Sequence, residues 1–113
     1  MPRDIWQALA DPTRRSILDC LAEKPLTTGD ICALFVALDR CTVMKHLEVL
    51  CEAGLVISER QGRTRINHLN SAPLLDQMER WLGRYRTKTA SAALRMKERI
   101  EGKQGKFGLP NPN

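Results

Sequence analysis

Residues 39–54 read DRCTVMKHLEVLCEAG and have the features of one capped helix. Asp39 is a good N-cap, because its carboxylate can accept a hydrogen bond from an unpaired backbone N–H in the first turn. Gly54 suits the left-handed position at which helices commonly end. Val43, Leu47 and Leu50 recur at helical spacing, so they predict one apolar face that packs into a core.

The opposite face of this helix changes character along its length. Arg40, Thr42 and Lys45 lie in the front half, whereas Glu48 and Glu52 lie in the rear half. A short helix with a basic, hydrogen-bonding front end suits insertion into the major groove of DNA. An ordinary amphipathic surface helix fits these residues equally well, so the flanking sequence has to decide between the two interpretations.

The composition is that of a small basic domain. The chain has 113 residues, of which 42% are hydrophobic, and a formal net charge of +5. A positive surplus favours a polyanionic partner such as nucleic acid. The sequence has no apolar run long enough to cross a bilayer, and its first residues lack the basic-then-apolar pattern of a signal peptide. We therefore expect a cytoplasmic protein with no membrane partner.

Two helices are expected directly before residue 39. Asp11 followed by Pro12 is the cap-then-proline pattern of a helix start. Thr27 or Thr28 caps a second helix, and a turn at residues 36–38 joins it to the helix at 39–53. This order of elements predicts a helix-turn-helix arrangement.

Two arginines stand at an unfavourable place in the first of these helices. Arg14 and Arg15 lie in its first turn, where cations oppose the helix dipole. Helix stability therefore does not explain them, and we expect them to contact a phosphate or an acidic partner.

A basic β-hairpin is predicted directly after the helix at 39–53. Residues 55–60 and 64–69 are rich in β-branched side chains and flank a turn that contains Gly62. Three cations gather near its tip: Arg60, Arg63 and Arg65. A cationic hairpin beside a candidate recognition helix is a wing, able to reach phosphates or a minor groove. The alternative is that the charges only protect the hairpin edges, and the order of helix and hairpin favours DNA binding.

A long amphipathic helix is expected after the hairpin, with Pro73 in its first turn. Its seam positions alternate in steps of three and four residues, the spacing of two helices that pack together. They are Leu75, Met78, Leu82, Tyr85, Thr89, Ala92 and Met96, with Trp81 beside them. So long a seam cannot be buried on a small domain, so we expect pairing across a two-fold axis. The alternative is that the helix folds back onto its own domain.

The end of the chain differs in composition from the rest. Residues 102–113 have little apolar content and are rich in Gly, Lys, Pro and Asn, so they are predicted to be a disordered tail. Residues 1–101 are then expected to form one DNA-binding and dimerisation domain.

Several separate motifs resemble the winged-helix repressors of the ArsR/SmtB family. They are LADPTRRSIL at 9–18, DRCTVMKHL at 39–47, EAGLV at 52–56, Gly62-Arg63 and Leu69-Asn70. The motifs stand in the family's order, and the resemblance covers about residues 5–86. Pro73-Leu74 and ERWLGRY at 79–85 further resemble a subgroup with a Trp-containing last helix.

The resemblance implies a homodimer that binds a palindromic operator in double-stranded DNA and represses transcription. The first and last helices would form the dimer interface, through Ile5, Trp6, Leu9, Leu75, Met78, Trp81, Leu82 and Tyr85. The helix at 39–53 and the wing at 56–69 would contact the operator. The residues expected at the DNA are Arg40, Cys41, Thr42, Met44, Lys45, His46, Arg60, Arg63 and Arg65.

The chain departs from the metal sensors of this family. Those have a Cys-x-Cys pair in the helix before the turn, where this chain has residues 27–29, Thr-Thr-Gly, with only Cys32 nearby. Other members place His and acidic ligands on the last helix, and this chain has no His after His68. Soft and borderline metals need clusters of thiolate or imidazole ligands. We therefore expect no metal site and no cofactor.

The four cysteines are expected to be free thiols. Cys20, Cys32 and Cys51 flank apolar stripes and are interpreted as small core residues. Cys41 is expected to be exposed at the front of the candidate recognition helix, where the helix end and nearby cations favour a thiolate. A redox-responsive repressor switched through Cys41 is therefore an alternative, and the simpler interpretation is that Cys41 fills a small polar position.

Neither histidine predicts a catalytic or metal role. His46 is expected to touch the DNA backbone or to stabilise the turn, and His68 has no evident function. No nucleophile, base and carboxylate have the spacing of a catalytic set, so we do not expect an enzyme.

Together these patterns predict a mainly α fold with a β-hairpin wing, a dimeric winged helix-turn-helix of about five helices. A sequence-specific DNA-binding repressor is the principal prediction. A winged-helix module that binds proteins through the same surface, without specific DNA binding, is the alternative from another functional class.

Overall fold

The computed structural model describes residues 4–86 and 88–104. The chain divides into two compact units, residues 1–75 and residues 76–113. The domain expected over residues 1–101 therefore contains a boundary after Leu75.

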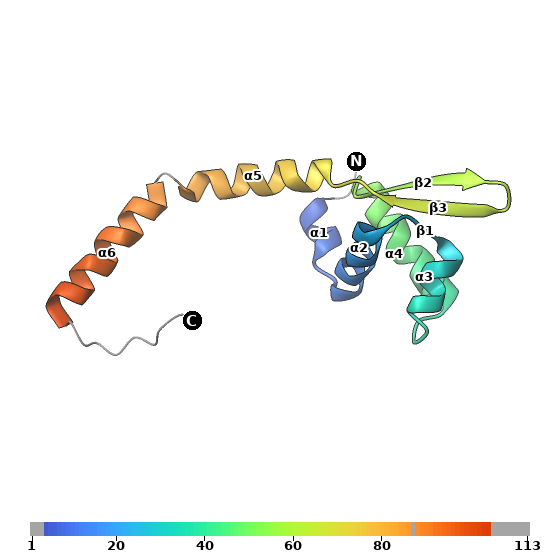
Figure 1. The fold of residues 1–113 in the computed structure, drawn as a ribbon, viewed down its shortest axis with the longest axis horizontal. Coiled ribbons are helices and arrows are strands. Elements are labelled where there is room, and N and C mark those ends of the chain that lie inside the picture. The colour runs from blue at the N-terminus through green and yellow to red at the C-terminus, as the bar shows by residue number, and fades with distance from the viewer. Residues whose placement is uncertain (1–3, 87, 105–113) are drawn as a thin grey trace. The chain divides into compact units, whose positions relative to one another are not determined.

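The first unit contains a helix-turn-helix followed by a β-hairpin (Figure 1). Its described elements are α1 (Ile5–Leu9), α2 (Pro12–Glu23), β1 (Leu26–Thr27), α3 (Thr28–Leu34), α4 (Arg40–Glu52), β2 (Val56–Gln61) and β3 (Thr64–Leu69). Then α5 (Ala72–Arg86) and α6 (Lys88–Gln104) follow. The predicted helix-turn-helix is α3, the turn and α4, and the predicted wing is the β2–β3 hairpin, so this part of the prediction is confirmed.

Side-chain caps determine where the helices of this motif begin. The Asp39 carboxylate accepts a hydrogen bond of 2.7 Å from the Thr42 N–H at the start of α4. Thr27 and Asp30 form a reciprocal capping box at the start of α3. After α4 the chain turns at Gly54, whose φ is 81°. The predicted helix limits at residues 39 and 54 are therefore confirmed.

Arg14 and Arg15 use their donors inside the fold. Arg14 donates to the carbonyl oxygens of Gln7, at 3.0 Å, and of Ala8, at 2.7 Å. Arg15 donates to the carbonyl of Leu9 at 2.6 Å. These carbonyls lie at the end of α1, where the helix dipole attracts cations. Arg14 also lies 3.4 Å from the Asp11 carboxylate, so the acidic partner among the expected contacts is confirmed for Arg14. A phosphate contact for this pair stays a prediction.

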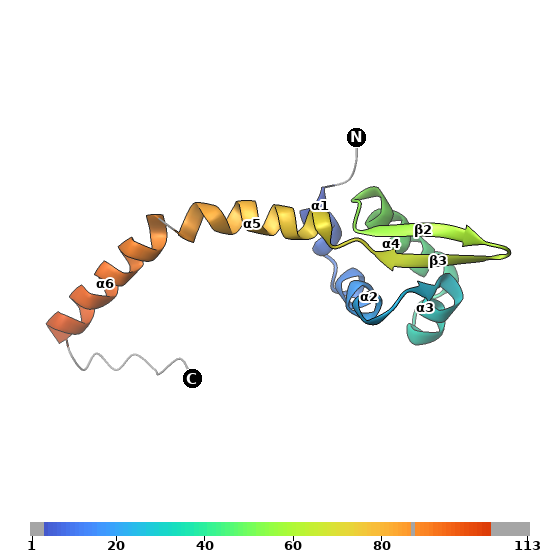
Figure 2. The ribbon, with the colours of Figure 1, turned by 45° about the horizontal axis from the view of Figure 1, so that its top comes forward.

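The three strands form an antiparallel sheet in the order β1-β3-β2. Helices α2, α3 and α4 lie on one face of it (Figure 1), and the tip of the β2–β3 hairpin extends past them (Figure 2). Along β2, buried Val56 alternates with exposed Ile57, as expected when one face is covered. The strand β1 was not predicted, because two residues are too few to show an alternating pattern. It pairs Leu26 with Asn67 of β3.

One apolar core fills the space between α2, α3, α4 and the base of the hairpin. Its largest fully buried apolar side chains are Ile17, Ile31, Val43, Leu50 and Leu55. Leu47 is only 6% exposed, so the predicted apolar face of the 39–53 helix is confirmed. The three cysteines interpreted as core residues do pack against this core and are partly buried: Cys20, Cys32 and Cys51.

The long helix predicted after the hairpin corresponds to α5 and α6, which makes six helices among the described residues rather than about five. Residue 87, between them, and residues 105–113 lie outside the described part of the chain. Residues 102–104 are helical, although we expected the disordered tail to begin at 102. Lys and Gln are good helix formers and compensate for Gly102. No helix in the described part is long and apolar enough to cross a membrane.

A buried amide connects the hairpin to the helices. Asn67 of β3 is 0% exposed, and its Nδ2 donates to the Leu26 carbonyl and to the Thr28 hydroxyl, both at 3.2 Å. Its Oδ1 accepts a 2.5 Å hydrogen bond from Ser58, whose hydroxyl oxygen lies 3.4 Å from the Cys51 sulfur. A buried amide is tolerated only when it is fully hydrogen-bonded. The network therefore fixes β3 against β1, β2, α3 and α4.

Replacing this amide should destabilise the fold. Asn67→Leu keeps a similar volume but removes the amide that bonds to the Thr28 hydroxyl, the Leu26 carbonyl and the Ser58 hydroxyl. We expect the free energy of unfolding, measured with urea, to fall by about 2–4 kcal/mol. The control Gln61→Leu, at an exposed wing position, should change it by less than about 0.5 kcal/mol. Equal stability of Asn67→Leu and the unchanged protein would contradict the role of the network.

Candidate nucleic-acid interface

The outward face of α4 lies opposite its buried stripe. Arg40, Cys41, Met44 and Lys45 are exposed, and Thr42 is half-buried beside them. Met44, an apolar residue, is 51% exposed. The front of α4 thus exposes two cations, a thiol and a thioether.

The N-cap keeps this front end in place. Hydrogen bonds from the Thr42 backbone N–H and then from the Thr42 hydroxyl hold the pKa of the Asp39 carboxyl below its usual 3.8, and Lys45 lowers this pKa further. A carboxyl with a lowered pKa contributes its full stabilisation above the usual value, and loses it only as pH falls through the lowered pKa. The first turn of α4 is therefore capped throughout the neutral range.

His46 faces α2 instead of the exposed front of α4. Its ring is 15% exposed, and its Nδ1 lies 3.3 Å from Nη1 of Arg14 and 3.5 Å from Oδ2 of Asp11. Asp11 is the N-cap of α2, so His46 connects the middle of α4 to the start of α2. The two roles expected for His46, touching the DNA backbone or stabilising the turn, stay predictions.

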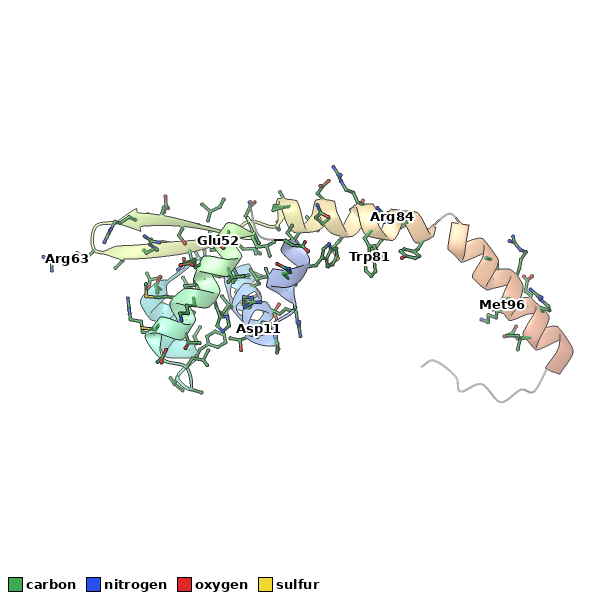
Figure 3. The ribbon with its side chains drawn as sticks, turned by 180° about the vertical axis from the view of Figure 1, so that it is seen from behind. Asp11, Glu52, Arg63, Trp81, Arg84 and Met96 are labelled. Carbon is green, nitrogen blue, oxygen red and sulfur yellow. The ribbon has the colours of Figure 1, made fainter. Side chains whose placement is uncertain are left out.

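Two arginines lie directly opposite each other in the hairpin. Arg60 on β2 is paired with Arg65 on β3, and like charges at opposed positions destabilise a sheet. Arg63 projects at the tip, in the turn after Gly62 (Figure 3). The one carboxylate of β2, Glu59, lies on the other face, since adjacent residues alternate, and its Oε1 is 3.1 Å from Nε2 of His68. The stability of the hairpin therefore does not explain why three arginines lie close together at its tip.

A cleft of about 370 Å³ lies between the hairpin and the front of α4. Four of its lining residues are arginines: Arg40 from α4, and Arg60, Arg63 and Arg65 from the hairpin. Residues 27–29, at the start of α3, and Met44 form other parts of its wall. None of the described residues that line this cleft is acidic. The cleft therefore suits an anion.

A second hollow, of about 280 Å³, lies further along α4. Glu48 and Glu52 line it together with Lys45 and Arg65. The carboxylates of α4 are thus confined to its rear half, as predicted from the sequence. Charge is separated along the groove between α4 and the hairpin, with cations at the front.

The apolar residues expected at a dimer interface lie on α1 and α5. On α1, Ile5 and Leu9 pack partly against the core and Trp6 is 38% exposed. On α5, Met78 is half-buried and four large apolar side chains are 41–59% exposed: Leu75, Trp81, Leu82 and Tyr85. The rings of Trp81 and Tyr85 meet edge to face, with their centroids 5.8 Å apart; Trp81 is labelled on α5 in Figure 3. Thr89, also expected in the seam, lies outside the described side chains.

Of the four cysteines, Cys41 alone is exposed. Its exposure was predicted, and its redox role stays a prediction. Among the side chains described in residues 4–104, no three from His, Cys, Asp and Glu are grouped closely enough to hold a metal ion.

Sequence reasoning missed three contributors to this surface. Residues 27–29 join the cleft, and Ser58 and Asn67 hold the hairpin behind it. Nothing in the local sequence marks them as parts of one surface. Ser58 faces Asn67 across the hairpin, and residues 27–29 join them through the pairing of β1 with β3, between segments about 40 residues apart.

Known proteins similar to this chain are regulators of transcription. Residues 9–59 match the family model described as a helix-turn-helix domain. The chain is 39% identical over 84 residues to the HTH-type transcriptional regulator YuzN of Bacillus subtilis, a match that spans 69% of this chain and 91% of YuzN. It is 33% identical over 79 residues to the transcriptional repressor SdpR of the same organism, spanning 70% of this chain and 86% of SdpR.

Solved structures share the fold. The crystal structure of an ArsR family transcriptional regulator aligns with a TM-score of 0.65 at 35% identity, covering 71% of this chain and 80% of that chain. An ArsR-like transcriptional regulator from Rhodococcus sp. RHA1 aligns with a TM-score of 0.68 at 28% identity, covering 87% and 88%. The observed winged helix-turn-helix is therefore the fold of these regulators.

The opposed arginines predict a variant that is more stable than the natural chain. Arg65→Thr removes the repulsion with Arg60 and places a β-branched residue in the strand. At low salt its melting temperature should rise by about 2 °C, and the gain should shrink at high salt because ions screen the repulsion. The control Glu59→Thr, which loses the His68 contact, should show no such gain. A lower melting temperature for Arg65→Thr would mean that the fold itself needs this arginine.

Proposed function

The chain belongs to the ArsR family of winged helix-turn-helix transcriptional regulators, and from this we propose that it is a homodimeric repressor of a palindromic DNA operator. The observation that supports it best is the cleft with four arginines between α4 and the hairpin. Opposed arginines lower the stability of the hairpin, whereas a bound polyanion would be attracted to both of them. The regulator would act in the cytoplasm, where its DNA lies.

The front of α4 is proposed to read base edges in the major groove. Lys45 is exposed there, and a lysine can donate to O6 and N7 of guanine. Met44 offers an apolar surface that suits the methyl group of thymine. Cys41 and Thr42 lie beside them. Arg63, at the tip of the hairpin, is proposed to reach the neighbouring minor groove or its phosphates.

The exposed apolar face of α5 supports the proposed dimer. Leu75, Met78, Leu82 and Tyr85 recur at helical spacing, with Trp81 at their side. A second copy of the same face would cover it in a two-fold arrangement. A two-fold dimer presents two recognition helices to two half-sites, which is why we propose a palindromic operator. The name of SdpR, a transcriptional repressor, supports repression as the outcome.

A protein-binding module is the alternative from another functional class. It would use the same exposed residues of α4 and the hairpin, but would not select a DNA sequence. Footprinting of the full chain on the DNA upstream of its own gene tests the proposal. A protected palindrome supports the repressor, and absence of protection at micromolar protein would favour the module. Repeating the footprint with an oxidant tests the alternative that Cys41 switches binding.

Two alanine variants should separate base reading from charge. Lys45→Ala should lower affinity for the operator by about tenfold and affinity for random duplex much less, because one base contact discriminates by roughly 1–3 kcal/mol. Arg63→Ala should weaken both duplexes by the same factor, since phosphate contacts do not depend on sequence. Affinities are measured by fluorescence anisotropy with the two duplexes. If Lys45→Ala lowered affinity for both duplexes by the same factor, Lys45 would not contact bases.

A charge on the α5 face should disrupt the proposed dimer. Leu82→Glu places a carboxylate among apolar side chains, so analytical ultracentrifugation should show monomers and operator affinity should fall at least tenfold. The control Leu94→Glu changes a leucine on α6 that is 56% exposed, against 41% for Leu82, and should leave the dimer intact. A dimer that survives Leu82→Glu would contradict this interface.

A further inference from the structure

The second hollow, of about 280 Å³ between α4 and the hairpin, has the chemistry of a small-molecule site. We propose that it binds a free α-amino acid with a small apolar side chain, and that the bound amino acid lowers the affinity of the protein for its operator. Binding of the amino acid does not depend on the proposed function, whereas its effect on the operator rests on that function.

The hollow has a floor of covered side chains and a rim of exposed ones. Its floor consists of the buried or half-buried residues Thr28, Leu47, Cys51, Ser58 and Asn67. Its rim consists of the exposed residues Met44, Lys45, Glu48, Glu52 and Arg65. The volume lies just below the range of roughly 300–1,000 Å³ that is usual for ligand pockets. The hollow therefore suits a small metabolite.

The rim has charges of both signs that are not paired with each other. Lys45 and Arg65 are cationic and Glu48 is anionic, yet among the described residues no ion pair joins Glu48 to either cation. A simple anion would be repelled by the carboxylates of the rim, and a simple cation by its two basic groups. A molecule with one carboxylate and one ammonium group is attracted to both kinds of charge.

The floor offers a hydroxyl donor to the carboxylate of such a molecule. Thr28 is 7% exposed, and its hydroxyl oxygen accepts a hydrogen bond of 3.2 Å from Nδ2 of Asn67. In the described part of the chain no contact supplies an acceptor for the hydroxyl hydrogen of Thr28 itself. Buried donors are normally hydrogen-bonded, so an oxygen atom of a ligand in the hollow would complete this group.

The other polar groups of the floor are already paired. Ser58 donates its hydroxyl hydrogen to Oδ1 of Asn67, so the Cys51 thiol, 3.4 Å away, is the donor to the Ser58 oxygen. Met44 and Leu47 supply apolar surface. The site thus has donors for a carboxylate, an acceptor for an ammonium group and room for an apolar side chain, which together describe an apolar amino acid.

A bound amino acid would withdraw Lys45 from the operator. The ammonium group of Lys45 is proposed to donate to guanine, and a carboxylate paired with it would compete for the same donors. Binding of the operator and binding of the amino acid would therefore oppose each other. Such coupling is reciprocal, since each ligand lowers the affinity for the other by the same factor. The amino acid would act as an inducer.

Calorimetric titration of the full chain with each of the standard L-amino acids tests the site without DNA. We expect at least one amino acid with an apolar side chain to bind in the micromolar to millimolar range. For the amino acid that binds best, the carboxylic acid that lacks its ammonium group and the amine that lacks its carboxylate should each bind about tenfold more weakly. No binding by any amino acid at millimolar concentration, or undiminished binding of either analogue, would overturn the proposal.

A variant of the rim connects this binding to the hollow. Glu48→Gln removes the carboxylate that faces the ammonium group, so it should weaken amino-acid binding about tenfold and leave the affinity for the carboxylic acid analogue unchanged. The control Glu98→Gln removes the same charge from α6, outside the hollow, and should bind the amino acid as the natural chain does. If Glu48→Gln binds the amino acid as tightly as the natural chain, the ligand does not lie in the hollow and the proposal fails.

Operator affinity distinguishes failure of this inference from failure of the proposed function. At an amino-acid concentration that saturates the natural chain, fluorescence anisotropy should show a loss of operator affinity of about tenfold for that chain and little loss for Glu48→Gln. Amino-acid binding without any change in operator affinity would overturn the inducer role while the repressor remains. A chain that binds no operator would refute the repressor, and calorimetry would still decide whether the amino-acid site exists.

Discussion

The buried amide of Asn67 is the contact on which the arrangement of the first unit depends. It connects β3 to the carbonyl of Leu26 and the hydroxyls of Thr28 and Ser58, and is wholly buried. Buried Leu55 and Val56 also anchor the base of the hairpin in the core, and the amide adds the polar contacts that hold β3 to β1 and α3. Together these contacts set the position of the hairpin beside α4.

Function and stability make opposite demands on the hairpin. A sheet is more stable when opposed side chains attract or pack, yet Arg60 faces Arg65. The helices, in contrast, follow the rules of stability closely. Asp39 and the Thr27–Asp30 pair cap them, and Arg14 and Arg15 neutralise the end of α1. Deviations from those rules are therefore concentrated on the surface proposed for DNA.

Local patterns were sufficient to predict most of the fold. The caps, the apolar stripe of Val43, Leu47 and Leu50, and the turn at Gly62 depend on residues close in sequence, so the helix-turn-helix and the hairpin were anticipated. The strand β1 was not, because its pairing with β3 depends on contacts across about 40 residues.

The candidate site was predicted less completely. Exposed cations on α4 and the hairpin were identified, since charge and helical phase are visible in the sequence. The direction of a side chain within the fold was harder to predict. For His46 the sequence left open a contact with the DNA backbone or a role in stabilising the turn, and did not indicate that its ring meets Arg14 beside Asp11. The contribution of residues 27–29 to the cleft also depends on tertiary contacts that no local pattern encodes.

The central claim is that a dimer of this chain binds the backbone and bases of one DNA duplex. Each copy would use its cationic surface formed by the front of α4 and the hairpin. The most direct test is the affinity of the full chain for its operator at several salt concentrations. Each phosphate contact releases bound counterions, so the logarithm of affinity should fall steeply with the logarithm of salt concentration, with a slope of roughly −5 or steeper. A slope near zero would show that phosphates contribute nothing, and would contradict the account of the cleft and of the regulator built around it.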